Sequence, residues 1–287
     1  MLDIGRWAKL GLDRHNGVAM EIGVGIRNMG TQSTRAVMAG CARAAETIGF
    51  ESIWVVDHIA IPPDDAEGSG GRYLDILSTL AWLAGITKQV KLGAGVLILP
   101  YRSALPTAKQ IATVQELSGN RLVLGVGIGW MDAEFQALGY ERRHRGRISD
   151  ETLAFFENCF ASDEVESHGQ TFLFKPRPPK PPILVGGRAP FAIERAAKFG
   201  DGWFPIARTP KDIASALPRY RELTDEAGKP AGQITASARL PLADQVETRH
   251  LLAEYQELGV NRLVCGFTYD TVADYQSQLD LLKSAID

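Results

Sequence analysis

Apolar and polar positions divide this chain into short strand-like runs separated by segments with helical periodicity. Over the first 130 residues, strands are predicted at 20–26, 52–56, 90–98 and 121–126, and helices at 33–47, 74–88 and 106–117. Ser33 is expected to cap the first helix and Gly49 to end it. The segment 59–73 is too rich in proline and glycine for regular structure. Alternation of strands and helices is typical of βα units that build a parallel sheet.

The alternation is interrupted after residue 130. Helical patterns at 131–138 and 146–160, a hairpin pattern around His168 and Gly169, and a proline-rich stretch come before the next strand. The remaining strands are predicted at 183–187, 202–205, 234–240 and 261–265, each followed by a helix. Eight such units favour an α/β fold made of a single (β/α)8 TIM barrel, with an insertion at about 131–180 between strands 4 and 5. An open doubly wound sheet is the competing architecture.

The stretch from Asn120 to Trp130, NRLVLGVGIGW, is the most distinctive part of the pattern. Its apolar strand ends in Gly125, Gly127 and Gly129, and an acidic helix start follows. Glycine lets the backbone approach a bound group closely, and the free amides of a helix N-terminus bind anions. The motif departs from the dinucleotide fingerprint G-x-G-x-x-G, because Trp130 takes the place of the third glycine. A tight turn that only packs strand against helix is the alternative interpretation.

Composition limits the classes of function. With 287 residues, 45% apolar and 23% charged, the chain is typical of globular proteins, and its net charge of −3 favours neither nucleic acid nor a membrane as a partner. Cys41, Cys159 and Cys265 are odd in number and far apart, which indicates a reducing cytoplasm and buried apolar roles. The histidines lack metal-ligand spacing, so no metal site is predicted. Residues 1–19 lack the apolar run of a signal peptide and are interpreted as an N-terminal extension to one domain, 20–287.

Several motifs occur in a characteristic order: VVDH at 55–58, the long segment 91–130, RGRISDE at 145–151, and the segment 181–205 with its GGR and GDGW. Through them the chain resembles the bacterial luciferase-like oxidoreductases, and among these the group that uses the deazaflavin coenzyme F420. The resemblance covers essentially Met20 to the C-terminus. It implies a homodimer of barrels, each of which holds a flavin-like ring at the strand ends and exchanges a hydride with it.

The resemblance also implies a role for each strand end. Asp57 would bond to a polar edge of the ring or orient His58, and His58 would lie near the hydride-accepting carbon and handle a proton. Gly186, Gly187 and Arg188 would bind the cofactor phosphate. The alternatives are that Asp57 caps the loop and His58 packs against it, and that residues 186–188 form an ordinary turn.

Further contacts with the ring are implied on the third and fourth strands, by Gly95, Val96, Leu97, Gly127, Gly129 and Trp130. A non-prolyl cis peptide is expected at Gly95-Val96 or Val96-Leu97. Trp130 replaces a glutamate acid of some F420-dependent sugar-phosphate dehydrogenases, so that activity is not expected. Glu134 is interpreted chiefly as favouring the N-terminus of its helix, and a contact with the ring is the alternative.

Arg142, Arg143, Arg145 and Arg147, together with His144, form a basic run. Such a run is interpreted as a solvated face that pairs with Asp150 or Glu151, or alternatively as an attraction for the acidic oligoglutamyl tail of F420.

The resulting hypothesis is a cytoplasmic F420-dependent oxidoreductase that acts on a small organic molecule. An FMN-dependent monooxygenase of the same superfamily is one alternative, and a non-catalytic protein that binds flavin or deazaflavin is another. The substrate is not predicted, because specificity lies in loops without a recognised pattern.

Overall fold

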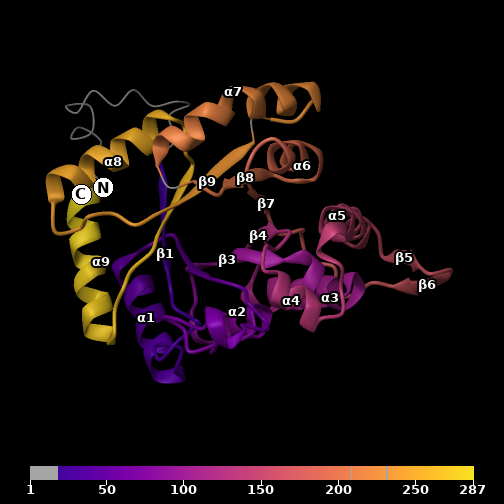
Figure 1. Cartoon of the computed structure of the whole chain (residues 1–287), viewed down its shortest axis with the longest axis horizontal. Coiled ribbons are helices and arrows are strands. Elements are labelled where there is room, and N and C mark those ends of the chain that lie inside the picture. The colour runs from indigo at the N-terminus through magenta and orange to yellow at the C-terminus, as the bar shows by residue number, and fades with distance from the viewer. Residues whose placement is uncertain (1–18, 208, 231) are drawn as a thin grey trace.

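Eight parallel strands form a closed ring at the centre of the molecule (Figure 1). The computed structural model describes residues 19–207, 209–230 and 232–287, so nearly all of the predicted N-terminal extension lies outside the described residues. Around the ring the order is β1-β10-β9-β8-β7-β4-β3-β2. The strands are β1 Glu21–Gly25, β2 Ser52–Val55, β3 Lys91–Ile98, β4 Leu122–Gly127, β7 Ile183–Gly187, β8 Gly202–Pro205, β9 Gln233–Ala238 and β10 Arg262–Cys265. The closed ring confirms the TIM barrel and excludes the open sheet.

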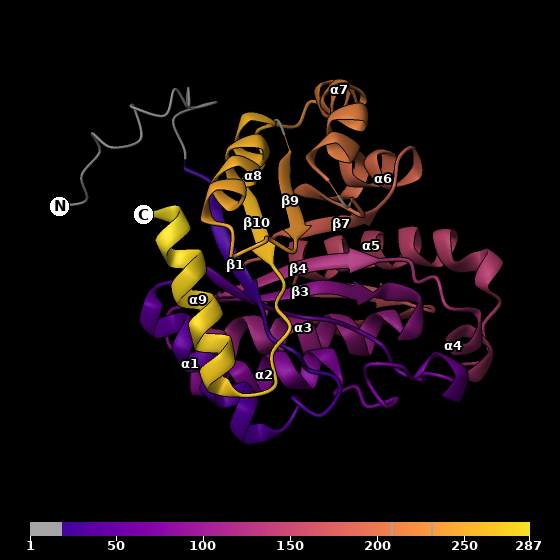
Figure 2. The same cartoon turned by 60° about the vertical axis from the view of Figure 1, so that its left-hand side comes forward.

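Helices surround the ring on its outer side, as Figures 1 and 2 show. They are α1 Arg35–Ile48, α2 Ile76–Ile86, α3 Ala104–Ser118, α6 Phe191–Phe199, α7 Pro210–Glu226, α8 Gln245–Glu257 and α9 Val272–Ile286. The last helix lies beside the first (Figure 2), where an added Cβ at Gly40 would stand 2.6 Å from Val272 Cγ2. The absence of a side chain at Gly40 therefore lets the two ends of the barrel domain pack together.

Local signals explain most helix boundaries. Gly49 ends α1 in the left-handed conformation, with φ of 92°, as predicted. The predicted N-cap at Ser33 is wrong. Thr34 caps α1 by accepting a hydrogen bond from Val37 N, whereas the Ser33 hydroxyl donates to Gly30 O and accepts from Arg72 Nε.

The predicted interruption after residue 130 corresponds to helices and a hairpin inserted between β4 and β7. It contains α4 Asp132–Ala137, the 3-10 turn η5 Arg142–His144, α5 Arg145–Ala161, and the antiparallel hairpin β5 Glu164–Ser167 and β6 Gln170–Leu173. The hairpin extends away from the barrel in Figure 1. Its base is anchored by Phe174, which is buried against Phe160 at a ring separation of 5.9 Å.

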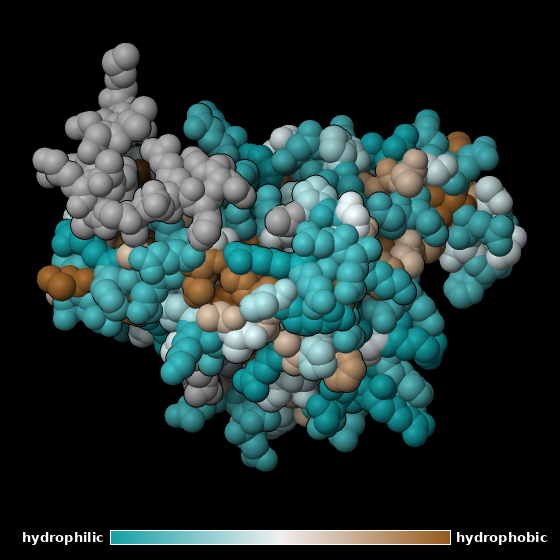
Figure 3. Space-filling model, turned by 90° about the horizontal axis from the view of Figure 1, so that it is seen from above, coloured by the Kyte–Doolittle hydropathy of each residue, from teal (hydrophilic) through white to brown (hydrophobic). Residues whose placement is uncertain are grey.

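One face of the molecule is mainly polar. Figure 3, a view from above, shows hydrophilic residues over most of this face and hydrophobic residues gathered in patches, one of them near its centre. None of the described helices is long and apolar enough to cross a membrane. The three cysteines are buried and free, and burial raises the pKa of Cys41 and Cys159 to about 11 and that of Cys265 to about 12. They are therefore poor nucleophiles at neutral pH.

Candidate functional site at the mouth of the barrel

Two aromatic side chains fill the lower interior of the barrel. Trp54 and Phe204 meet edge to face at 5.5 Å, and they pack with Val123, Leu184 and Val264. Glycines make the space for them: an added Cβ at Gly23 or Gly93 would overlap the indole of Trp54. The barrel is therefore closed below this cluster, and any ligand must bind above it, at the carboxyl ends of the strands.

The inner wall above this cluster carries few side chains. Residues on a strand alternate between the two faces, so Gly25 on β1 and Gly95 on β3 face inward, since each lies two residues beyond Gly23 or Gly93. Gly266 has the same parity as Val264 on β10. All three glycines are partly exposed, whereas Val24, Ala94 and Cys265, which precede them, are buried. The mouth thus has open backbone on β1 and β10, while the Cβ position of Gly95 on β3 lies 3.2 Å from Trp54 Cε3.

The expected cis peptide is present, between Gly95 and Val96. At this point the register of β3 against β4 shifts, between Ala94 and Leu97. Val96 is partly exposed, and its methyl groups cover the backbone of two neighbouring strands. An added Cβ would stand 2.6 Å from Val96 Cγ2 at Gly127 and 3.0 Å from Val96 Cγ1 at Gly186.

These contacts assign a packing role to several glycines of the predicted site. Gly127 and Gly186 accommodate Val96, and Gly129, with φ of 74°, packs against Ile98 and Phe135. Leu97 is fully buried in the core. Of the residues expected to contact a ring, Gly95, Val96, Gly129 and Trp130 are thus at least partly exposed. Leu97 and Gly127 are buried, and Gly127 shapes the surface from beneath.

His58 is held at the mouth by a buried carboxylate. Glu134 on α4 is fully buried, and its oxygens lie 2.9 Å from His58 Nδ1 and 2.6 Å from the Tyr101 hydroxyl. The backbone N–H groups of Ile59 and Ala60 also donate to Glu134, at 2.6 and 3.1 Å. Four donors therefore converge on one carboxylate, and they join the loop after β2 to α4.

The charge of Glu134 determines which nitrogen of His58 is available. Burial opposes ionisation, but the hydrogen bonds from His58, Tyr101 and the two backbone amides outweigh it and lower the pKa of Glu134 to about 2. At neutral pH the carboxylate can only accept, so Nδ1 of His58 must carry a proton. Nε2 has no hydrogen-bond partner among the described residues, and it is the nitrogen left to exchange a proton with a bound molecule.

Asp57, which follows β2, accepts hydrogen bonds from residues at the end of the neighbouring strand β3 and just beyond it. Its two oxygens accept a bidentate pair from Arg102, at 2.6 and 2.8 Å, and one also accepts from Ile98 N at 2.9 Å. Arg102 in turn pairs with Asp75 at the start of α2. In this arrangement Asp57 secures the end of β3, directly after the cis peptide, and it makes no hydrogen bond to His58.

The rim next to His58 is aromatic and apolar. The imidazole lies edge to face with Tyr73 at 4.9 Å and with Trp130 at 6.2 Å. Trp130 is 64% exposed, and Ile59 and Ile206 on the loops after β2 and β8 are 47% and 64% exposed. Large apolar side chains left open to solvent at a strand-end mouth indicate a surface that a ligand covers.

The end of β7 has a backbone conformation that favours glycine. Gly187 has φ of 138°, and an added Cβ there would stand 2.9 Å from Ala192. Arg188 is exposed and forms no ion pair within the described part of the chain. Its guanidinium is therefore available to an anion.

The basic run lies on the insertion and is largely neutralised. Arg142 pairs with Asp132, Arg143 with Glu141, and Arg147 with Glu151. The pairing of the run with Glu151 was predicted for a solvated face. Asp150, the other predicted partner, pairs with Arg195 instead.

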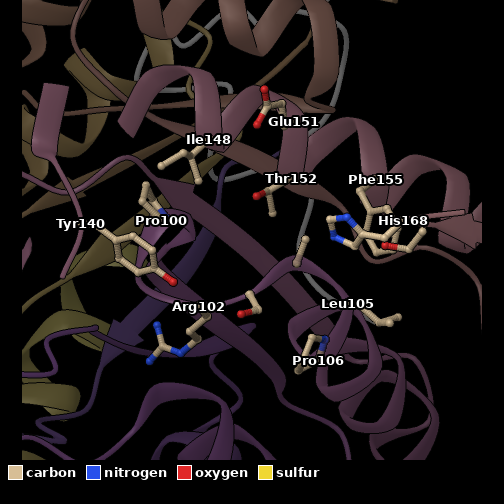
Figure 4. Close-up of a pocket in the computed structure, with 13 residues that line it drawn as sticks. Pro100, Arg102, Leu105, Pro106, Tyr140, Ile148, Glu151, Thr152, Phe155 and His168 are labelled. Atoms are coloured by element: carbon tan, nitrogen blue, oxygen red, sulfur yellow. The ribbon is translucent and has the colours of Figure 1, made fainter. Parts of the chain in front are cut away.

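A separate cavity of about 460 Å³ lies outside the strand ring (Figure 4). Its walls come from the start of α3, from α5 and from the tip of the hairpin, including Leu105, Phe155 and His168. Its link to the mouth is Arg102, which lines the cavity while it holds Asp57. We place the candidate site at the mouth, because His58 and the exposed backbone of β3 are both there.

Sequence reasoning missed the partners of the predicted catalytic pair. Glu134 and Tyr101 hold His58, and Arg102 holds Asp57. Each of them lies at the carboxyl end of a strand or just beyond it, which is the one signal that could have singled them out. Their pairing depends on the order of strands around the barrel, which sequence does not provide.

Comparison with known proteins identifies the family of the chain. The family model described as luciferase-like monooxygenase matches residues 18–274. An uncharacterized protein of Mycobacterium tuberculosis is 32% identical over 206 residues, covering 66% of this chain and 71% of the relative. The 5,10-methylenetetrahydromethanopterin reductase of Methanolobus tindarius is 29% identical over 206 residues, covering 70% of this chain and 59% of that protein.

Solved structures share the fold at low sequence identity. The monooxygenase RslO1 from Streptomyces bottropensis has a TM-score of 0.78 at 18% identity, over 93% of this chain and 98% of that one. An F420-dependent secondary alcohol dehydrogenase in complex with an F420-acetone adduct has a TM-score of 0.75 at 17% identity, over 92% and 99%. From the family match over most of its length, this chain belongs to the luciferase-like monooxygenase family of oxidoreductases.

Proposed function

We propose that this protein is an F420-dependent oxidoreductase that transfers a hydride between the deazaflavin and a small organic substrate. The observation that carries the proposal is the pairing, at one mouth, of the partly exposed residues Gly95 and Val96 with His58, whose Nδ1 is fixed by the buried Glu134. An accessible surface at the strand ends suits a bound ring, and an oriented histidine suits proton transfer beside it.

The residues present fit such a cofactor. Added Cβ atoms at Gly25 and Gly266 would find no described protein atom nearer than 3.6 and 3.8 Å, so the wall there is open above the backbone. Gly187 and the free guanidinium of Arg188 provide donors for a phosphate at the end of β7. The deazaflavin, when bound, supplies the hydride chemistry, and the protein supplies position and a proton.

Each residue of the site would then have one task. His58 holds or releases a proton at Nε2, and Glu134 with Tyr101 keeps its ring in place. Asp57 and Arg102 hold the end of β3 beneath the ring surface. Trp130 and Tyr73 limit the access of water to His58 from the rim.

The choice of F420 over FMN is supported by the likeness to a methylenetetrahydromethanopterin reductase and to an F420-dependent alcohol dehydrogenase. An FMN-dependent monooxygenase is the second candidate, and it is favoured by the high structural similarity to RslO1. Both cofactors need the same ring surface and phosphate site, so binding has to separate them.

The test is a pair of titrations of the purified protein with F420 and with FMN, followed by fluorescence. We expect F420 to bind at least about tenfold more tightly. His58→Ala should retain F420 binding and lose most of the turnover, by about 10²–10⁴-fold, as expected for a general acid or base. Tighter binding of FMN would overturn the assignment to F420. Unchanged turnover in His58→Ala would remove the proposed proton transfer.

A further inference from the structure

Two arginines at the mouth follow strands other than those that carry His58 and its neighbours. In the strand order, β2, β3 and β4 are consecutive and carry His58, the cis peptide and Trp130. Strands β1, β10 and β9 are also consecutive, with β1 next to β2 in the closed ring, and the chain segments that continue β1 and β9 carry Arg27 and Arg239. The mouth therefore has a basic side, β1–β10–β9, next to the side that carries His58.

Both arginines lie at the mouth: strand parity directs Arg239 inward, and Arg27 lies just beyond the end of β1, with its Nη2 beside Gly68 and Gly30. Arg27 follows Gly23 and Gly25 at intervals of two, and its exposure fits that series, because Gly25, Arg27 and Met29 are partly exposed while Ile26 and Asn28 are buried. On β9, Thr235 contacts the interior Arg262, so Ser237 and Arg239 face the same way. Arg239 Cγ lies 3.8 Å from the position of a Cβ on the inward-facing Gly266.

Neither guanidinium is neutralised by a described residue. Arg239 is exposed and forms no ion pair or side-chain hydrogen bond in the described part of the chain. Arg27 donates from Nη2 to Gly68 O at 3.1 Å, but its Nε is buried without a partner. A buried guanidinium N–H without an acceptor is costly, and a bound anion would satisfy it.

Spacing allows both groups to act on one ligand. In the register, Val24, Cys265 and Ala238 are level, so Arg239 lies one residue and Arg27 three residues beyond that line. The two strands are two strand spacings apart, about 10 Å, across β10. Two long side chains that start at this separation can converge on one carboxylate or phosphate, and the exposed hydroxyl of Ser237 on β9, two residues before Arg239, is a further donor.

We propose that the substrate carries an anionic group, a carboxylate or a phosphate, which binds Arg27, Ser237 and Arg239 on the β1–β10–β9 side. This inference rests on the proposed function, since it makes the basic side the anchor for the substrate and leaves the β7 turn with Arg188 for the cofactor. The bound anion would place the rest of the substrate across the mouth, toward His58.

The test measures the binding of two probes to the protein without cofactor, by calorimetry: inorganic phosphate, and benzoate as a carboxylate with an apolar body. We expect the wild-type protein to bind at least one of them. Arg239→Gln and Arg27→Gln should each weaken that binding about tenfold or more, and Ser237→Ala by less. Arg43→Gln, an exposed arginine on α1, is the matched control and should bind like the wild type.

The F420 titration of the same variants separates the two proposals. Arg239→Gln should change F420 affinity by less than about threefold, whereas Arg188→Gln should weaken it about tenfold. Equal losses of F420 and anion affinity in Arg239→Gln would show that the basic side holds the cofactor and would overturn the inference. Lack of anion binding by the wild type, or anion affinities in Arg239→Gln equal to those of Arg43→Gln, would also overturn it. If anions bind as expected but F420 does not, the proposed function fails and the anionic site stands.

Discussion

Glu134 shows how a single carboxylate organises the candidate site. It is fully buried, and its four donors come from His58, Tyr101 and the backbone at Ile59 and Ala60. An ionised carboxylate is tolerated in the interior only when its oxygens are satisfied in this way. The same hydrogen bonds fix the tautomer of His58, so stability and chemistry depend on one group.

Replacing Glu134 by glutamine should destabilise the protein. The amide keeps one acceptor oxygen but presents an NH2 group to donors, so at least one buried N–H or O–H loses its partner. We expect the free energy of unfolding to fall by about 2–4 kcal/mol, measured by urea denaturation. Glu141→Gln, in which a surface carboxylate loses its pair with Arg143, is the control and should cost less than about 1 kcal/mol. A similar effect of both substitutions would contradict the assigned role of Glu134.

The stability of the wild type and that of Glu134→Gln should respond differently to acid. The pKa of Glu134 is about 2 in the folded state, below its ordinary value of 4.5, so the folded protein binds this proton less readily than the unfolded chain. Its contribution is present above about pH 4.5 and is lost as the pH falls toward 2. The shift of the pKa from 4.5 to about 2 corresponds to a contribution of about 3 kcal/mol to the free energy of unfolding. The difference in unfolding free energy between wild type and Glu134→Gln should therefore be constant from pH 5 to 7 and shrink below about pH 4.5. A difference that stays constant down to pH 3 would show that Glu134 is not ionised with this pKa.

At the scale of elements, strand β3 and its neighbours form one interlocked surface. The register shift at the cis peptide turns Val96 onto the glycines of β4 and β7, and Asp57 from β2 holds the amide of Ile98 just beyond. The shape of the mouth thus depends on backbone positions without side chains. A β-bulge of this kind changes the direction of a strand near an active site.

Gly127→Ala should test this packing. Its Cβ would stand 2.6 Å from Val96 Cγ2, and we expect a loss of about 1–3 kcal/mol in unfolding free energy from overpacking. Adding Val96→Ala removes the methyl groups in contact. Gly127→Ala should therefore cost at most half as much unfolding free energy in the Val96→Ala background as in the wild type. Gly85→Ala is the control, because no atom lies within 4 Å of its added Cβ and the residue is in helix α2; it should be neutral or stabilising by about 0.5–1 kcal/mol. Additive effects at Gly127 and Val96 would refute the contact.

The order of the elements was predictable from sequence, and the reason is physical. Alternating apolar periods, together with stop signals such as Gly49 and Gly119, determine where a strand or helix begins and ends. Closure of the ring determines which residues meet at the strand ends. It brings Glu134 on α4 next to His58, although the two residues are 76 positions apart in the sequence. Glu134 therefore appeared in the sequence as a helix-terminal charge. In the structure Gly127 packs against Val96, and Gly129 packs against Ile98 and Phe135, so their contact with a cofactor stays a prediction.

At the scale of the whole molecule, the barrel separates stability from function. Its lower interior is closed by Trp54 and Phe204, and below them Arg262 pairs with Glu21 and Glu51. Burial opposes ionisation of Glu51, but Arg262, Lys91 and Ser52 lower its pKa to about 2. The Glu51 carboxylate at the bottom of the barrel therefore stays charged at neutral pH. The upper end keeps open backbone and unpaired arginines, which is the less stable arrangement until a ligand binds.

Binding of the cofactor should consequently raise the thermal stability of the whole protein. A ligand present at 100 times its dissociation constant adds about 2.7 kcal/mol, which corresponds to a rise in Tm of roughly 5–10 °C for a domain somewhat smaller than this chain. We expect such a rise with F420 in differential scanning calorimetry and a smaller one with FMN at equal concentration. Arg188→Gln should reduce the rise in Tm with F420 by about half, because a tenfold weaker affinity removes about 1.4 kcal/mol. The same substitution should leave the Tm without ligand unchanged, since Arg188 has no ion pair among the described residues. An equal rise in wild type and Arg188→Gln would place the cofactor phosphate elsewhere, and a larger rise with FMN than with F420 would favour the monooxygenase.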